Sequence, residues 1–118
     1  MTKIVMIYDR NIPVGFKMEG HAGYNPGGPD ILCASLSAIS QMTTNGILNW
    51  LVDDYDVVVQ KCNPRTGVLH VLVPEEFMGN ITVQQFLTAF EMHAKSLSDI
   101  YIEYITIGRE DVNDNANS

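Results

Sequence analysis

The sequence predicts an α+β fold with two layers, in which two helices cover a mostly antiparallel sheet of about five strands. Three observations support this prediction. The chain has 118 residues, which is enough for one hydrophobic core. Several short runs are rich in β-branched residues or alternate between apolar and polar residues. Two longer stretches repeat apolar residues with helical spacing, and the elements follow the order ββαββαβ.

The first twenty residues predict a β-hairpin. Residues 3–8 (KIVMIY) are strongly β-prone, and the turn-forming sequence Asp-Arg-Asn follows them. Residues 14–19 (VGFKME) alternate between apolar and polar or small side chains, as a half-buried strand does. Residues 20–29 (GHAGYNPGGP) contain four glycines and two prolines, so they predict a loop.

A long helix is predicted from residue 31 to about residue 50. Asp30 is a favoured N-cap, and Pro29 disfavours an earlier start. Two stripes follow the helical period. The apolar stripe consists of Leu32, Leu36, Ile39, Ile47 and Trp50. The small and polar stripe consists of Cys33, Ser37, Ser40, Gln41 and Thr44.

The second half of the chain predicts another hairpin, a second helix and a last strand. Residues 55–62 and 67–73 are β-prone and flank the turn sequence Asn-Pro-Arg-Thr. Thr82 and Gln85 have the spacing of a capping box, and an apolar helical face follows them. Residues 100–107 predict the last strand. The predicted domain therefore covers residues 1–107, and residues 108–118 are expected to form a flexible, polar, acidic tail.

Composition limits the classes of function. Fourteen acidic residues against seven basic ones give a net charge of −7, which disfavours a nucleic-acid partner and allows attraction of a basic one. No run is expected to have the length and apolarity of a membrane span, and the N-terminus lacks the pattern of a signal peptide. We therefore expect a cytoplasmic protein without a membrane partner. Two cysteines and three scattered histidines predict neither a disulfide scaffold nor a metal site.

The chemically dense region surrounds the glycine-rich loop. Cys33 is expected in the first turn of the helix, where the helix dipole favours a thiolate. His21 begins the loop and could fold back over the helix start, which would supply an acid and base for nucleophilic acyl transfer. Asp30 has two open roles, because it could cap the helix or orient the imidazole. Against this chemistry, a single cysteine near a helix start is more often a small packed side chain.

A sequence motif favours the catalytic interpretation of Cys33 over the packed one. The blocks GHAGY at residues 20–24 and DILCA at residues 30–34, with Ser-Ala at 37–38, resemble the signature of the ribosomal-processing cysteine protease family called Prp. The resemblance implies a homodimeric cytosolic endopeptidase without a cofactor, with Cys33 as nucleophile and His21 as general acid and base. It also implies site-supporting roles for Asp30 and Ser37. The loop residues expected to gate the substrate are Gly20, Gly23, Tyr24, Gly27 and Gly28.

The resemblance also implies a substrate class. Members of this family remove a short N-terminal extension from large-subunit ribosomal protein twenty-seven, and some relatives act on phage structural proteins. We therefore expect a peptide segment of a ribosomal or phage precursor as the partner. The alternative from a different class is a non-catalytic dimeric module that binds a basic protein segment, with Cys33 as a packed helix residue.

Overall fold

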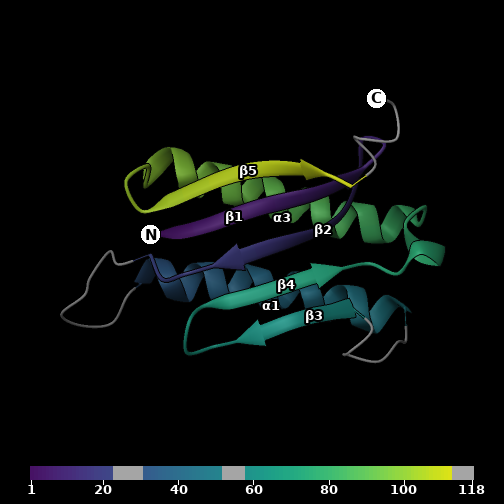
Figure 1. Ribbon diagram of the computed structural model, residues 1–118, viewed down its shortest axis with the longest axis horizontal. Coiled ribbons are helices and arrows are strands. Elements are labelled where there is room, and N and C mark those ends of the chain that lie inside the picture. The colour runs from purple at the N-terminus through teal and green to yellow at the C-terminus, as the bar shows by residue number, and fades with distance from the viewer. Residues whose placement is uncertain (23–30, 52–57, 113–118) are drawn as a thin grey trace.

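The computed structural model describes residues 1–22, 31–51 and 58–112. Five strands form one sheet in the order β3-β4-β2-β1-β5, and two long helices lie on one face of it (Figure 1). Adjacent strands are antiparallel except β1 and β5, which are parallel. The two-layer α+β fold and the ββαββαβ order are therefore confirmed, with a short 3-10 helix at Glu75–Phe77 between β4 and the second long helix.

The first hairpin consists of β1 (Thr2–Asp9) and β2 (Ile12–Glu19). Arg10 and Asn11 both have positive φ, of 53° and 67°, which is the backbone of a tight two-residue hairpin turn. The predicted alternation is confirmed, because Val14, Phe16 and Met18 are all buried on the face of β2 that the helices cover.

The first helix, α1 (Ile31–Leu51), has the predicted bounds, but its two stripes differ from the prediction. Trp50 is 52% exposed, whereas Ser40 and Thr44 of the polar stripe are buried. Burial of these hydroxyls is possible because each donates to a carbonyl of the preceding turn: Ser40 Oγ to Ser37 O, and Thr44 Oγ1 to Ser40 O. Part of the polar stripe of α1 is therefore buried in the protein, while Gln41 stays exposed.

By length and composition alone, α1 could also cross a membrane, since an 18-residue window of it has a mean hydropathy of 1.2. The expectation that no segment has this character is therefore wrong for α1. The helix packs as a core helix, with Leu32, Leu36 and Ile47 buried against the sheet.

The second hairpin consists of β3 (Val59–Asn63) and β4 (Val68–Leu72). β4 lies within its predicted range, whereas β3 ends one residue later than predicted, at Asn63, which was assigned to the turn. Residues 55–57 of the first predicted strand fall outside the described part of the chain. β3 is an edge strand of the sheet, and only its first residue, Val59, is buried. The turn that joins the two strands lies at the same end of the sheet as the end of β2, because β2 and β4 are antiparallel neighbours.

The second long helix, α3, spans Ile81–Ile100 and corrects two predictions. Its N-cap is Asn80, whose side chain accepts a hydrogen bond from Val83 N, so Thr82 lies inside the first turn and forms no capping box. The helix also includes Ile100, which was expected to begin a strand. The partly buried Leu97 in the last turn supports helical packing there, and this contact outweighs the β-propensity of Ile100.

The last strand, β5 (Ile105–Asp111), ends later than expected. The predicted tail boundary at residue 108 is wrong, because residues 108–111 pair with β1 in parallel register as far as Tyr8 and Asp111. Their polar side chains are compatible with an edge strand that is open to solvent on one side. Residues 113–118 of the predicted tail lie outside the described residues.

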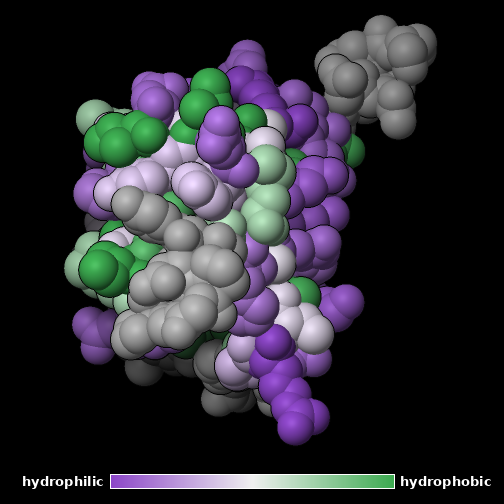
Figure 2. All heavy atoms as spheres, turned by 90° about the vertical axis from the view of Figure 1, so that its left-hand side faces the viewer, coloured by the Kyte–Doolittle hydropathy of each residue, from purple (hydrophilic) through white to green (hydrophobic). Residues whose placement is uncertain are grey.

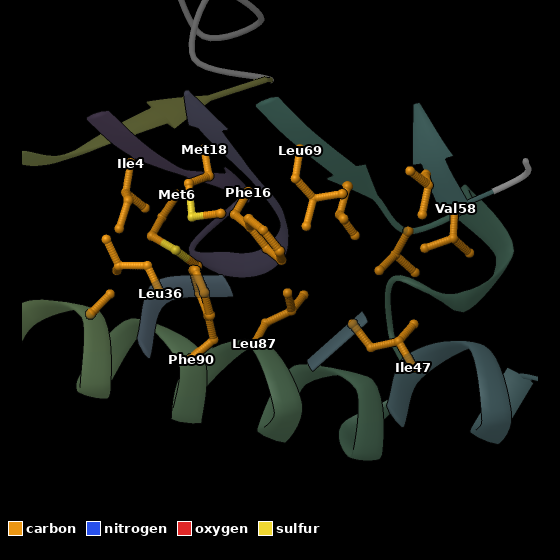
Figure 3. Packing of buried hydrophobic residues seen from close by; sticks show 14 of the residues in the cluster. Ile4, Met6, Phe16, Met18, Leu36, Ile47, Val58, Leu69, Leu87 and Phe90 are labelled. Carbon is orange, nitrogen blue, oxygen red and sulfur yellow. The ribbon is translucent and has the colours of Figure 1, made fainter. Parts of the chain in front are cut away.

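The hydrophobic core lies between the sheet and the two helices. Phe16 of β2 stacks on Phe90 of α3, with ring centroids 4.3 Å apart, and Leu36 of α1 lies near this pair (Figure 3). At Gly46 of α1, an added Cβ would lie 2.6 Å from the ring of Phe86, so glycine allows α1 and α3 to pack closely. The core thus fixes α1 on the sheet beside the ends of β2 and β3.

Candidate active site

A cavity of about 500 Å³ lies between α1 and the β3–β4 hairpin, and we call it the groove. The polar stripe of α1 forms one wall through Ser37, Gln41 and Thr44. The hairpin and its turn form the other wall, which includes Cys62 and Gly67. None of the described residues that line the groove is Asp, Glu, Lys or Arg. The groove therefore suits an uncharged segment of a ligand.

His21 and Cys33 meet at one end of the groove. His21 lies two residues after the end of β2, and Cys33 is the third residue of α1. Cys33 Sγ lies 3.7 Å from His21 Nδ1, within hydrogen-bonding range for sulfur. The packing of β2 and α1 in the same core brings the two side chains together, although twelve positions separate them in the chain. The structure therefore places His21 beside Cys33, as the sequence predicts.

Backbone groups supply the other contacts of this pair. Ala22 N donates to Cys33 Sγ at 3.2 Å, and a negatively charged sulfur accepts such a bond better than a neutral thiol does. On the other side of the imidazole, His21 Nε2 lies 2.8 Å from the main-chain oxygen of Arg65, in the β3–β4 turn. The imidazole is exposed and the thiol is half-buried, so a ligand in the groove can reach both.

This arrangement can perform nucleophilic acyl transfer. A thiol beside an imidazole can pass its proton to the ring nitrogen and attack an electrophilic carbonyl carbon. The imidazolium that results can then protonate a leaving amine. The start of α1 adds the positive end of a helix dipole close to the sulfur, which favours negative charge there.

The structure describes only some of the other predicted site residues. Ser37 lines the groove, and its Oγ accepts a hydrogen bond from Gln41 Nε2 at 2.7 Å. Gly20 also lines the groove. The remaining predicted residues, Asp30, Gly23, Tyr24, Gly27 and Gly28, lie outside the described residues. The proposed roles of Asp30 and of the gating loop therefore stay predictions.

Sequence reasoning missed the contribution of the second hairpin. Cys62 was not among the predicted site residues, yet it lines the same groove as Cys33. Arg65 was not singled out at all, although its carbonyl contacts His21. Gly67 gave the only available signal, since a glycine after a turn sequence often marks a positive φ, and φ is 68° here. A backbone contact between distant segments has no residue signature in the sequence.

The other histidines lie away from this pair. His70 Nε2 contacts Glu19 Oε1 at 2.8 Å, and His93 is exposed on α3. Over residues 1–22, 31–51 and 58–112, no three His, Cys, Asp or Glu side chains are grouped as metal ligands would be.

A thiol and an imidazole at the end of a groove, on a two-layer α+β fold, define the class of cysteine proteases. The comparisons identify the family within this class. The family model described as cysteine protease Prp matches residues 1–106, so the chain belongs to the Prp family of cysteine proteases. This membership confirms the family that the GHAGY and DILCA blocks indicated, and it favours the protease over the non-catalytic module.

Solved structures agree with this fold. The ribosomal processing protease Prp from S. aureus, in complex with a covalently linked product peptide, has a TM-score of 0.80 at 21% identity, over 93% of this chain and 100% of that one. The same enzyme with a substrate peptide gives a TM-score of 0.77 at 19% identity, with 93% and 100% covered. A Streptococcus mutans protein has a TM-score of 0.79 at 22% identity, with 94% and 95% covered. A comparison with curated protein sequences gives no match.

Proposed function

We propose that this protein is a cytoplasmic endopeptidase that removes a short N-terminal extension from a ribosomal precursor, most specifically large-subunit ribosomal protein twenty-seven. Cys33 is the nucleophile and His21 is the general acid and base. The observation that carries the proposal is the 3.7 Å contact between Cys33 Sγ and His21 Nδ1 at the end of the groove, in a chain of the Prp family. The similar S. aureus structures, which hold a substrate or product peptide, support a peptide ligand.

The reaction follows from the positions of these two side chains. His21 Nδ1 takes the thiol proton, and Cys33 Sγ attacks the scissile carbonyl carbon to form a tetrahedral intermediate. The carbon–nitrogen bond breaks as the imidazolium protonates the leaving amine, and a thioester remains on Cys33. Water, activated by the same imidazole, then hydrolyses the thioester and restores the thiol.

The lining of the groove supports an uncharged peptide segment next to the scissile bond. Apolar surface comes from Met18, Leu36 and Leu69, and the polar stripe of α1 adds hydroxyl and amide groups. The side chain of Ser37 supports the site by shaping the wall of the groove beside Cys33. The net charge of −7 acts over a longer range and favours approach of a basic precursor.

We also propose that the enzyme is a homodimer. α1 contains no charged residue over 21 positions, yet Ile31 and Met42 on it are 76% and 69% exposed. In Figure 2, hydrophilic residues cover most of the right side of the view, and hydrophobic residues are interspersed with hydrophilic ones on its left. Two copies that each carry a charge of −7 associate best through an uncharged surface, and the outer face of α1 offers one. Sedimentation that shows only a monomer at micromolar concentration would contradict this proposal.

Mass spectrometry of precursor proteins tests the proposed activity. The purified protein is mixed with the ribosomal precursor, and the expected product is the precursor shortened at a single bond near its N-terminus. Cys33→Ser is the matched control, because it replaces only the sulfur atom of the proposed nucleophile. Cleavage by that variant at the wild-type rate would contradict the proposal. Cleavage of a phage structural precursor, but not of the ribosomal one, would replace the proposed substrate.

A further inference from the structure

The contact between His21 and the β3–β4 turn determines which ring nitrogen carries the hydrogen. His21 Nε2 lies 2.8 Å from Arg65 O. A carbonyl oxygen can only accept a hydrogen bond, so Nε2 must be the donor. In a neutral imidazole, Nδ1 then carries no hydrogen, and Nδ1 is the atom that faces Cys33 Sγ at 3.7 Å. This tautomer is the one that can accept the thiol proton.

We propose that the main-chain carbonyl of Arg65 is the positioning group of the active site, so that the β3–β4 turn holds the imidazole in its productive tautomer. The inference rests on the proposed role of His21. Both ring nitrogens already have partners, namely Arg65 O and Cys33 Sγ, so a carboxylate could reach the ring only by replacing one of them. The carbonyl also accepts from the imidazolium, so the contact persists when His21 gains the thiol proton.

Hydrogen bonds within the turn hold the Arg65 peptide groups in place. Arg65 N donates to Asn63 Oδ1 at 3.1 Å, and Thr66 Oγ1 donates to Asn63 O at 3.5 Å. Asn63 is the last residue of β3 and pairs with Val68 of β4, so the Asn63 side chain ties Arg65 to the sheet. Because Asn63 does not line the groove, a change there alters the turn without removing a groove wall.

Two glycines set the distance between the turn and His21. Gly67 has a φ of 68°, and a Cβ there would lie 2.5 Å from Gly20 O and 3.3 Å from His21 Cε1. Gly20 has a φ of 89°, and its carbonyl oxygen accepts a hydrogen bond from Thr2 Oγ1 at 3.3 Å. The backbone of the turn therefore packs directly on the backbone that precedes His21. A side chain at residue 67 would move the Arg65 carbonyl and the imidazole relative to each other.

The test combines histidine NMR with cleavage kinetics on the full chain. Nitrogen-15 chemical shifts distinguish a protonated from a bare ring nitrogen, and the His21→Ala variant identifies the His21 signals among the three histidines. We expect hydrogen on Nε2 of His21 in the neutral wild-type protein. A dominant tautomer with hydrogen on Nδ1 would overturn the inference, whether or not the protein cleaves a precursor.

Two variants should disturb the tautomer and slow the chemical step. Asn63→Ala removes the acceptor for Arg65 N, and we expect kcat to fall about tenfold with KM unchanged. Asn63→Asp keeps an acceptor and should restore kcat.

Gly67→Ala should lower kcat about a hundredfold, since a misplacement of about 1 Å has such an effect. Gly79→Ala is its matched control, because a Cβ at Gly79 meets nothing within 4 Å.

The outcomes separate this inference from the proposed function. A wild-type tautomer and kcat in both Asn63→Ala and Gly67→Ala would show that the turn does not position His21. Equal kcat in Asn63→Ala and Asn63→Asp would show that the hydrogen bond to Arg65 N does not position His21. Wild-type cleavage by Cys33→Ser would instead disprove the proposed nucleophile, and the NMR result on the His21 tautomer would still decide the inference.

Discussion

Two polar regions lie toward opposite ends of β1 and differ in the groups that their side chains bind. Thr2, at the start of β1, lines the groove, and Tyr8, near the end of β1, is about 20 Å further along at the usual rise of a strand. The described lining of the groove has no carboxylate, lysine or arginine side chain. The second region, which we call the Tyr8 network, contains four such groups, Glu91, Lys95, Arg109 and Asp111, together with Tyr8 and Asn11.

In the Tyr8 network the charged groups bind one another. Tyr8 donates a hydrogen bond to Glu91, which also pairs with Lys95 at 3.4 Å. Arg109 lies over the ring of Tyr8, 3.9 Å from its centroid, and donates to Asp111 Oδ1 at 2.8 Å. Charges that satisfy one another leave little capacity for a ligand, so this network stabilises the junction of α3, β1 and β5. In the groove, by contrast, an exposed imidazole and a half-buried thiol contact each other and backbone groups.

The largest expected effect separates activity from stability at the groove. Cys33→Ser and His21→Ala should each lower kcat/KM at least about a thousandfold, because the nucleophile and its base act as one unit. The free energy of unfolding should change by less than about 1 kcal/mol, since His21 is exposed and Cys33 is only partly buried at the edge of the core. Peptide-cleavage kinetics and urea unfolding measure the two quantities. His93→Ala, an exposed histidine on α3, is the matched control and should retain full activity.

A thiol-alkylation experiment sharpens the same contrast without a substrate. Cys33 and Cys62 both line the groove, but within the described part of the chain only Cys33 lies in hydrogen-bonding range of an imidazole. At neutral pH we expect Cys33 to react with iodoacetamide faster than Cys62 does. His21→Ala should slow the reaction of Cys33 roughly tenfold and leave that of Cys62 unchanged. Peptide mapping by mass spectrometry follows each site, and equal rates at the two cysteines would contradict an activated Cys33.

The Tyr8 network should show the opposite pattern, with an effect on stability and none on activity. Tyr8→Phe removes the hydroxyl that binds Glu91, and we expect a loss of about 1–2 kcal/mol in the free energy of unfolding. Tyr8→Leu also removes the ring beneath Arg109 and should be less stable than Tyr8→Phe. Both variants should cleave peptide at the wild-type rate. A fall in kcat would mean that the two regions are coupled along β1.

Local sequence patterns predicted most of the fold and the pair formed by His21 and Cys33. Contacts between segments far apart in the chain could not be predicted. The strands and α1 follow from alternation and helical period, and the GHAGY and DILCA blocks indicated His21 and Cys33. The start of α3 was misplaced because Thr82 fits a capping box as well as Asn80 fits a simple cap. The carbonyl of Arg65 had no signal, since every residue has one and only the register of the β3–β4 hairpin brings this one to His21.

The smallest expected effect is a pH dependence that arises in the Tyr8 network alone. Burial, the hydrogen bond to Glu91 and the negative charge of Glu91 together raise the pKa of Tyr8 from 10.0 to about 12, against the opposing effect of Arg109. Between these two values the unfolded chain releases the phenolic proton while the folded protein retains it. The unfolded state then binds fewer protons, so the free energy of unfolding falls as the pH rises through this range. Urea unfolding of wild type should show this decline, and Tyr8→Phe should show a shallower one. Ultraviolet titration of tyrosinate should likewise lose its latest step in Tyr8→Phe, whereas a loss of signal near pH 10, with the latest step kept, would show that the phenol of Tyr8 is not held by Glu91.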